Sequence, residues 1–202
     1  MFLTRMALDE NQEETKAFLH DTGRMQREIR ATFAGGTLQP LYRLDLISSR
    51  LWLVVLSRLR PTMYQLHERY GYPGVFPSWE TFDYDETLYE AENGTTWNFE
   101  LTASPQGIMP DRDPNLTDVR WLTQWLAHQG DQCGFELKSA EVPEAAWIPA
   151  DDAYILEAVW TGVLTVRDQE TFTWSVENGI GNGRENGLGL MTIARNHTFW
   201  ED

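Results

Sequence analysis

The chain has 202 residues, of which 42% are hydrophobic, and its formal net charge is -15. This length suits one domain or a close-packed pair, and no run approaches the roughly 20 apolar residues that a transmembrane helix needs. The short N-terminal run MFLTRMAL is interrupted by Arg5 and is unlike a signal peptide, so we expect a cytoplasmic protein with no membrane contact.

Few side chains suit a metal or redox centre. Cys133 is the only cysteine, so the chain forms no internal disulfide and no thiolate cluster. The four histidines, His20, His67, His128 and His197, lack the close spacing of a zinc or iron site. We therefore expect no metal and no other cofactor.

The charge is distributed unevenly along the chain. Residues 1–70 contain ten Lys or Arg and eight Asp or Glu, whereas residues 71–202 contain six and 23. Non-specific affinity for nucleic acid comes mostly from Lys and Arg, so the C-terminal portion should repel DNA and RNA. Solubility alone explains an acidic composition equally well.

The N-terminal residues predict the order strand, helix, hairpin, helix. We expect a strand at 2–8, a helix at 10–31 with Asp9 as its N-cap, a hairpin made of LYRLDL and LWLVVLS with Ser48 and Ser49 in its turn, and a helix at 62–70. These elements make up most of a β-α-β-β-α-β ferredoxin-like unit. Its fourth strand is not evident in the sequence.

The same order recurs loosely after an acidic, aromatic stretch at residues 76–95, which is the candidate linker. The expected elements are a strand in WNFELTASP, a helix at 115–129 capped by Asn115 or Thr117, a strand in FELKSAEV, a long strand in AYILEAVWTGVLTVRD with a bend at Gly162, a helix at 168–178 and a strand in LGLMTIA. The predicted fold class is α+β, with two tandem ferredoxin-like, RRM-like domains at residues 1–90 and 91–202.

A glycine-rich loop, GIGNGRENGLGL, follows the last predicted helix and precedes the last strand. Such loops often present backbone N–H groups to a phosphate or an RNA backbone. The spacing fits neither a Rossmann fingerprint nor a P-loop, which also require the opposite order of strand and helix. The alternative is that the backbone path itself needs glycine, for positive φ or for close packing.

Five segments in order resemble the CasE family, the CRISPR repeat-RNA endonucleases of type I-E systems within the RAMP superfamily. These segments are MFLTRMAL, LYRLD, FELTASP, GVLTV and GIGNGRENGLGLMTIA. The resemblance implies two ferredoxin-like domains side by side, an RNA hairpin held across them, and metal-free cleavage of that RNA.

The sequence departs from the family at the catalytic position. Gln26, next to Met25, stands where the resemblance places the family's histidine. A glutamine amide does not titrate near neutral pH, so it cannot act as a general acid or base. His20 is a weak candidate to replace the histidine, and no catalytic residue is assigned with confidence.

The expected RNA-binding positions are also altered. The family-like strand carries Glu100 and Thr102 at its variable positions, and the following loop holds one arginine between two aspartates. The residues expected to be RNA-binding or vestigial are Arg24, Arg27, Gly179, Gly181, Arg184, Gly187 and Gly189. Selection for binding a polyanion would favour more basic residues than these.

Three functions remain open. The first is a CasE-like protein without nuclease activity that binds proteins of the type I-E Cascade effector, as a decoy or an anti-CRISPR-like inhibitor. The second is a repeat-RNA endonuclease that uses Tyr42, His20 or another group. The third is a non-catalytic Cascade subunit that still binds the repeat hairpin.

A partner-binding patch is predicted in the acidic, aromatic stretch, because exposed aromatic residues favour protein interfaces. It comprises Trp79, Phe82, Asp83, Tyr84, Asp85 and Glu86. The aromatic residues could equally cover a small core. Trp121 and Trp125, four residues apart, could stack on bases but are expected on the buried face of their helix.

Overall fold

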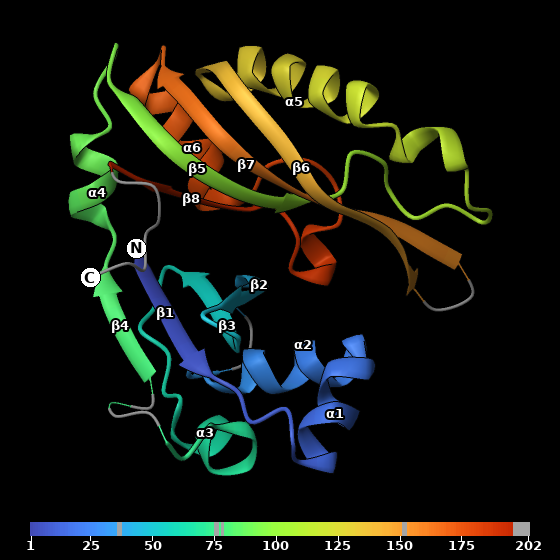
Figure 1. Cartoon of the computed structure of the whole chain (residues 1–202). Helices are drawn as coiled ribbons and strands as arrows, with labels where there is room; N and C mark the ends of the chain where they lie inside the picture. The colour runs from blue at the N-terminus through green and yellow to red at the C-terminus, as the bar shows by residue number, and fades with distance from the viewer. Residues whose placement is uncertain (36–37, 75–76, 78, 151–152, 196–202) are drawn as a thin grey trace. The chain divides into compact units, whose positions relative to one another are not determined.

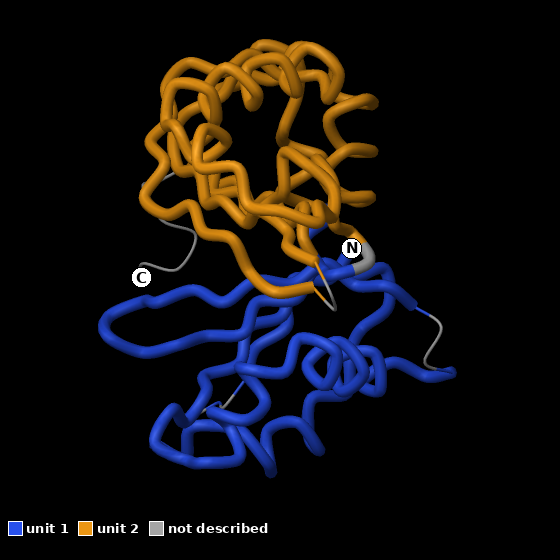
Figure 2. Tube along the Cα trace, turned by 90° about the vertical axis from the view of Figure 1, so that its right-hand side faces the viewer, with its two compact units in different colours: residues 1–85, 185–187 blue, residues 86–184, 188–202 orange. Residues whose placement is uncertain are grey.

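The computed structural model describes residues 1–35, 38–74, 77, 79–150 and 153–195. The chain divides into two compact units (Figure 2). Unit 1 contains Met1–Asp85 and Glu185–Gly187, and unit 2 contains Glu86–Arg184 and Leu188–Asp202. Three residues of the glycine-rich loop thus belong to the N-terminal unit.

Unit 1 is a four-stranded sheet in the order β2-β3-β1-β4, in which all neighbours are antiparallel (Figure 1). Its elements in chain order are β1 (Phe2–Ala7), α1 (Glu13–His20), α2 (Thr22–Ala31), β2 (Leu41–Ile47), β3 (Arg50–Ser57), α3 (Tyr64–Tyr70) and β4 (Trp79–Asp83). This order and pairing are those of a ferredoxin-like unit and confirm the predicted topology.

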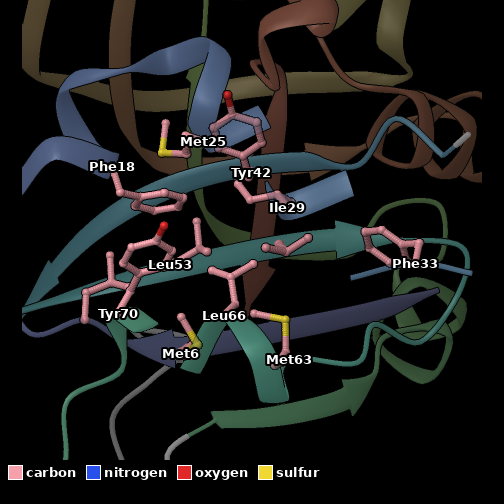
Figure 3. Packing of buried hydrophobic residues seen from close by; sticks show 12 residues of the cluster. Met6, Phe18, Met25, Ile29, Phe33, Tyr42, Leu53, Met63, Leu66 and Tyr70 are labelled. Carbon is pink, nitrogen blue, oxygen red and sulfur yellow. The ribbon is translucent and has the colours of Figure 1, made fainter. Parts of the chain in front are cut away.

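The core of unit 1 lies between one face of this sheet and the helices α1, α2 and α3. Strand side chains alternate between faces, so Met6 of β1 and Leu53 of β3, which pair with each other, point to the same side. They belong to one buried cluster with Ile29 of α2 and Leu66 of α3 (Figure 3). The buried Phe18 and Tyr70 rings stack with their centroids 4.2 Å apart. Burial of these aromatic and aliphatic groups fixes α2 on the sheet.

The predicted helix at 10–31 is wrong in its extent, because two helices occupy this region. The Asp21 carboxylate accepts a hydrogen bond from the Arg24 backbone N–H at 2.8 Å and caps α2. Asp9 caps neither helix, and its carboxylate accepts from the backbone N–H of Asn11. Aspartate competes well for free N–H groups at a helix start, so the chain ends one helix and begins another at Asp21.

Ser48 and Ser49 form the hairpin turn between β2 and β3, as predicted. Both residues have positive φ angles, 50° and 60°. Two consecutive positive φ values match the twist of the flanking strands. The strand that the sequence did not reveal is β4, with the sequence WETFD. It is a short edge strand, and three of its five residues are polar, so it lacks an apolar run.

Unit 2 repeats the topology, with strand order β6-β7-β5-β8 and antiparallel neighbours. The helix α4 (Asp85–Glu90) comes first in the chain. The elements after it are β5 (Thr96–Ala103), η1 (Pro114–Thr117), α5 (Val119–Cys133), β6 (Phe135–Ala150), β7 (Ala153–Val166), α6 (Gln169–Asn178), η2 (Arg184–Asn186, with residues assigned to both units) and β8 (Leu190–Ala194). The α+β prediction of two tandem ferredoxin-like folds is therefore confirmed. The stretch at 76–95, expected as a linker, contains β4 and α4.

Two helices cover one face of the unit 2 sheet. Trp125 of α5 stacks on Trp160 of β7 with 5.2 Å between ring centroids, and Phe172 of α6 meets Phe135 edge-on at 6.1 Å. Trp121 and Trp125 are half-buried, whereas Leu122 and Leu126 are fully buried. The face of α5 that packs on the sheet is therefore centred on the two leucines, and the two tryptophans flank it.

Two details of unit 2 correct the sequence interpretation. The predicted helix caps Asn115 and Thr117 lie in η1, and α5 begins later with Asp118, whose carboxylate accepts from two backbone N–H groups. At Gly162 the irregularity lies in the partner strand β6, which has register shifts on either side of it. A Cβ on Gly162 would lie 2.1 Å from the Ser139 carbonyl oxygen, so glycine permits this close approach.

Within the described residues, none of the helices is both long and apolar enough to cross a bilayer.

Candidate functional site

Gln26 contacts the glycine-rich loop within unit 1. Its neighbour Met25 is buried in the core and fixes the rotation of α2, which leaves Gln26 half-buried. The Gln26 Nε2 donates a hydrogen bond to the Asn186 Oδ1 at 3.1 Å. The position that the family resemblance assigns to the catalytic histidine is therefore occupied by an amide bonded to another amide.

The next loop residue, Gly187, packs directly on Tyr42 of β2. The Tyr42 backbone N–H donates to the Gly187 carbonyl oxygen at 2.9 Å. Gly187 has a φ of +83°, and a Cβ there would lie 1.9 Å from the Tyr42 ring. Only glycine fits this backbone conformation and this contact without displacement.

This arrangement contains an amide pair and a buried phenol. Tyr42, the alternative acid or base, is 5% exposed. His20, the other alternative, is an exposed residue at the end of α1, so it belongs to a different helix from Gln26. The structure thus brings Gln26, Tyr42 and the loop together, and it places His20 on a separate element.

Arg24, two residues before Gln26, is neutralised by carboxylates. Its guanidinium contacts Glu28 at 3.0 Å and Glu14 at 3.1 Å, and Arg69 contacts the same two carboxylates. Burial, followed by hydrogen bonding to Glu28, raises the pKa of Tyr70 to about 12 in this network. Arg24 is therefore already paired in the structure.

Arg27 differs from Arg24 in its surroundings. Its side chain is exposed, and none of the described carboxylates lies within ion-pair distance. Of the two arginines that flank Gln26, Arg27 is the one whose charge is uncompensated within the described part of the chain.

The other loop glycines follow the fold of unit 2. Gly179, Gly181 and Gly189 all have positive φ. The Gly189 N–H donates to the Thr102 carbonyl at 2.8 Å, and its own carbonyl accepts from the Ile180 N–H at 3.0 Å. Positive φ angles and these backbone hydrogen bonds give the loop glycines a role in the fold of unit 2.

The predicted partner-binding patch is smaller than expected. Tyr84 has no exposed surface, because it packs inside the fold, so it is unable to contact a partner. Trp79 is half-buried and packs against the core of unit 1. Asp85 pairs with the N-terminal ammonium group of Met1.

The remaining members of the patch, Phe82, Asp83 and Glu86, are exposed. Phe82 is 37% exposed and is the patch's remaining exposed aromatic residue.

Sequence reasoning missed an acidic group on the unit 2 sheet. Glu100 of β5 and Glu141 of β6 both pair with Thr161 of β7, one from each side. Glu144 pairs with Val159, and Glu157 lies two residues before Val159 in β7. Paired residues and alternate residues of a strand share a face, so the four carboxylates lie on the face opposite α5 and α6.

We call these four residues, Glu100, Glu141, Glu144 and Glu157, the acidic sheet face. Burial, with a further contribution from the Glu144 charge, raises the pKa of Glu157. These four glutamates are spread over three strands without a regular spacing in the sequence. Their common face follows from the strand register.

Among the described residues, no group of three or more His, Cys, Asp or Glu side chains is arranged to hold a metal ion.

The family model described as CRISPR associated protein matches residues 1–195. The chain therefore belongs to this family of CRISPR-associated proteins. No curated protein matches it.

Solved structures of similar fold include the CRISPR endoribonuclease Cse3 bound to a 19-nucleotide RNA, with 22% identity, coverage of 96% of this chain and 98% of that chain, and a TM-score of 0.75. Cas6e from Escherichia coli K-12 matches with 15% identity over 97% and 100% of the two chains, at a TM-score of 0.67. A chain of E. coli Cascade bound to a PAM-containing DNA target matches with 14% identity over 97% and 100%, at 0.50. These similarities confirm the expected resemblance to CasE and its two-domain fold.

Proposed function

We propose that this CRISPR-associated protein does not cleave RNA and acts by binding protein subunits of a type I-E Cascade effector, as a decoy or inhibitor. The observation that carries this proposal is Gln26, whose side-chain amide bonds to Asn186 in place of a titratable group. Loss of a general acid or base typically lowers a rate by about 10² to 10⁴. His20 is exposed but belongs to α1, a different helix from that of Gln26. Tyr42 is buried.

The second support is electrostatic. Arg24 is already paired with Glu14 and Glu28, and the acidic sheet face carries charge of the same sign as RNA. A surface of this kind repels a polyanion and suits basic protein surfaces. Because a structural relative is a chain of Cascade, the proteins of that complex are the natural partners.

Cleavage is tested with a repeat stem-loop RNA in EDTA, followed by analysis for a 2',3'-cyclic phosphate product. We expect the unaltered protein to leave the RNA intact. Gln26→His should restore weak cleavage at most, because the neighbouring Arg24 remains held by carboxylates. Gln26→Asn is the matched control that changes the side chain without adding an imidazole. Efficient cleavage by the unaltered protein would overturn the proposal.

Partner binding is tested by co-purification with the assembled type I-E complex and with its separate subunits. We expect a stable complex with at least one protein subunit in the absence of RNA. Paired substitutions Glu141→Lys and Glu144→Lys should weaken it, whereas Glu10→Lys, an exposed residue of unit 1, should have little effect. Failure to bind any subunit would contradict the proposal.

A second candidate function is favoured by Arg27 and Arg184, which are exposed and have no carboxylate within ion-pair distance among the described residues. Each cation is able to contact a backbone phosphate of a repeat hairpin without cutting the RNA. This function predicts hairpin binding with a steep salt dependence, lost on Arg27→Gln or Arg184→Ala. It also predicts strong cleavage by Gln26→His, which the first proposal does not.

A further inference from the structure

Unit 2 contains a cavity of about 310 Å³ between the C-terminal part of α5, the helix α6 and the start of the glycine-rich loop. Its lining residues are Gln129, Gln132, Cys133, Trp174, Ser175, Gly179, Ile180, Gly181, Asn182 and Arg184. All of them belong to unit 2, whereas Gln26 and Asn186 belong to unit 1. The lining of the cavity therefore shares no residue with the pair Gln26 and Asn186.

The chemistry of this cavity differs from that of the surrounding chain. Residues 71–202 contain 23 acidic and six basic side chains, yet the lining includes one arginine and no carboxylate. Arg184 is exposed and has no described carboxylate within ion-pair distance. A cation with no carboxylate partner among the described side chains, in an otherwise acidic unit, favours an anionic ligand.

A backbone donor adds to this preference. The N–H group of Gly181, which lines the cavity, donates to no acceptor among the described residues. The next residue, Asn182, is fixed, because its backbone N–H and its side-chain Nδ2 donate to the carbonyls of Ser104 and Pro105 at 2.8 and 3.2 Å. A free backbone N–H beside an arginine is able to contribute to anion binding.

The rim of the cavity provides a flat apolar surface. Trp174 of α6 is 59% exposed. An exposed indole ring stacks well on a nucleobase, and the amide side chains of Gln129 and Gln132 have the donors and acceptors that base edges require. The Gln132 amide lies 3.2 Å from the His128 ring, which orders it at the end of α5.

We propose that this cavity binds a free mononucleotide, with its phosphate on Arg184 and the Gly181 N–H and its base on Trp174. The volume falls at the small end of the range of ligand pockets, about 300 to 1,000 Å³, which suits one nucleotide and not a stem-loop. This binding site is independent of the proposed protein-binding function.

Cys133 supplies a reporter for the test. It is the only cysteine of the chain and lines the cavity, so a thiol-labelling reagent modifies the protein there alone. Burial raises the pKa of its thiol, against the opposing effects of Ser175 and of the Arg184 charge. Labelling should therefore be slow, and an occupant of the cavity should slow it further.

The experiment titrates the full chain with AMP, adenosine and inorganic phosphate, following heat by calorimetry and Cys133 labelling by mass spectrometry. We expect saturable AMP binding, protection of Cys133, and binding of adenosine at least tenfold weaker than that of AMP. Arg184→Gln and Trp174→Leu should each weaken AMP binding about tenfold or more. Arg120→Gln, an exposed arginine of α5 outside the cavity, should leave it unchanged.

Absence of saturable AMP binding would overturn the proposal, as would equal binding of adenosine and AMP. Binding that persists unchanged in Arg184→Gln would place the nucleotide elsewhere and have the same consequence. Binding of a stem-loop RNA without binding of AMP would also refute a mononucleotide site.

Discussion

Gln26 and Gly187 show how single residues define the candidate site. The resemblance to CasE pointed to Gln26, but its partner Asn186 lies 160 positions further along the chain. No local pattern links two amides at this separation. Gly187 was expected to bind RNA or to be vestigial, and its contact with Tyr42 gives it a structural role that its sequence context does not reveal.

Substitution of Gly187 by alanine tests this contact. We expect Gly187→Ala to destabilise unit 1 through the positive φ and through the collision with Tyr42. Gly94→Ala is the matched control, because Gly94 has a similar φ of +86° and no atom within 4 Å of the added Cβ. The control should lose about 1 kcal/mol, and Gly187→Ala about 1–3 kcal/mol more, measured by urea unfolding. Equal losses would show that the loop moves away freely.

At the scale of elements, helices and strands with regular hydrophobic patterns were predicted well. The hairpin β2–β3 and the strands β1, β5 and β8 combine apolar runs with clear turn or loop signals. The division of α1 from α2 was missed, because Asp21 interrupts a pattern whose apolar spacing continues across it. The edge strand β4 was missed because its pairing with β1, more than its composition, makes it a strand.

Asp21 should stabilise α2 as its N-cap. We expect Asp21→Ala to lower the free energy of unfolding by about 1 kcal/mol, since the Arg24 N–H loses its acceptor. Asp21→Ser should retain most of the stability, because serine also caps helices. Asp9→Ala serves as a comparison that leaves both helix caps intact. Unfolding midpoints in urea that are unchanged for Asp21→Ala would contradict this role.

At the scale of the whole molecule, the net charge of -15 opposes compaction. The register of β5, β6 and β7 concentrates part of this charge on the acidic sheet face. Burial and the neighbouring Glu144 charge raise the pKa of Glu157, which means that its ionised form is unfavourable in the fold. Glu157 is therefore a position of unit 2 at which a neutral side chain should be favoured over an ionised carboxylate.

Salt should stabilise the protein by screening this repulsion. Between low and physiological ionic strength we expect the thermal midpoint to rise by about 2–4 °C, which corresponds to about 1 kcal/mol for a chain of this size. The double variant Glu144→Gln, Glu157→Gln should have a higher midpoint at low salt and a smaller rise. A midpoint that falls with NaCl, measured by calorimetry, would contradict the importance of this repulsion.

The sequence by itself determined the α+β class, the repeated ferredoxin-like order and the family resemblance, which drew attention to Gln26. These follow from local hydrophobic periodicity, turn residues and motifs, which neighbouring residues encode. Only the tertiary structure decided that Gln26 bonds to Asn186, that Tyr84 is buried, that four glutamates share a sheet face, and that an arginine, a tryptophan and two glutamines line one cavity. Strand register and packing bring together residues that are distant in the chain, and this pairing leaves no pattern in a single sequence.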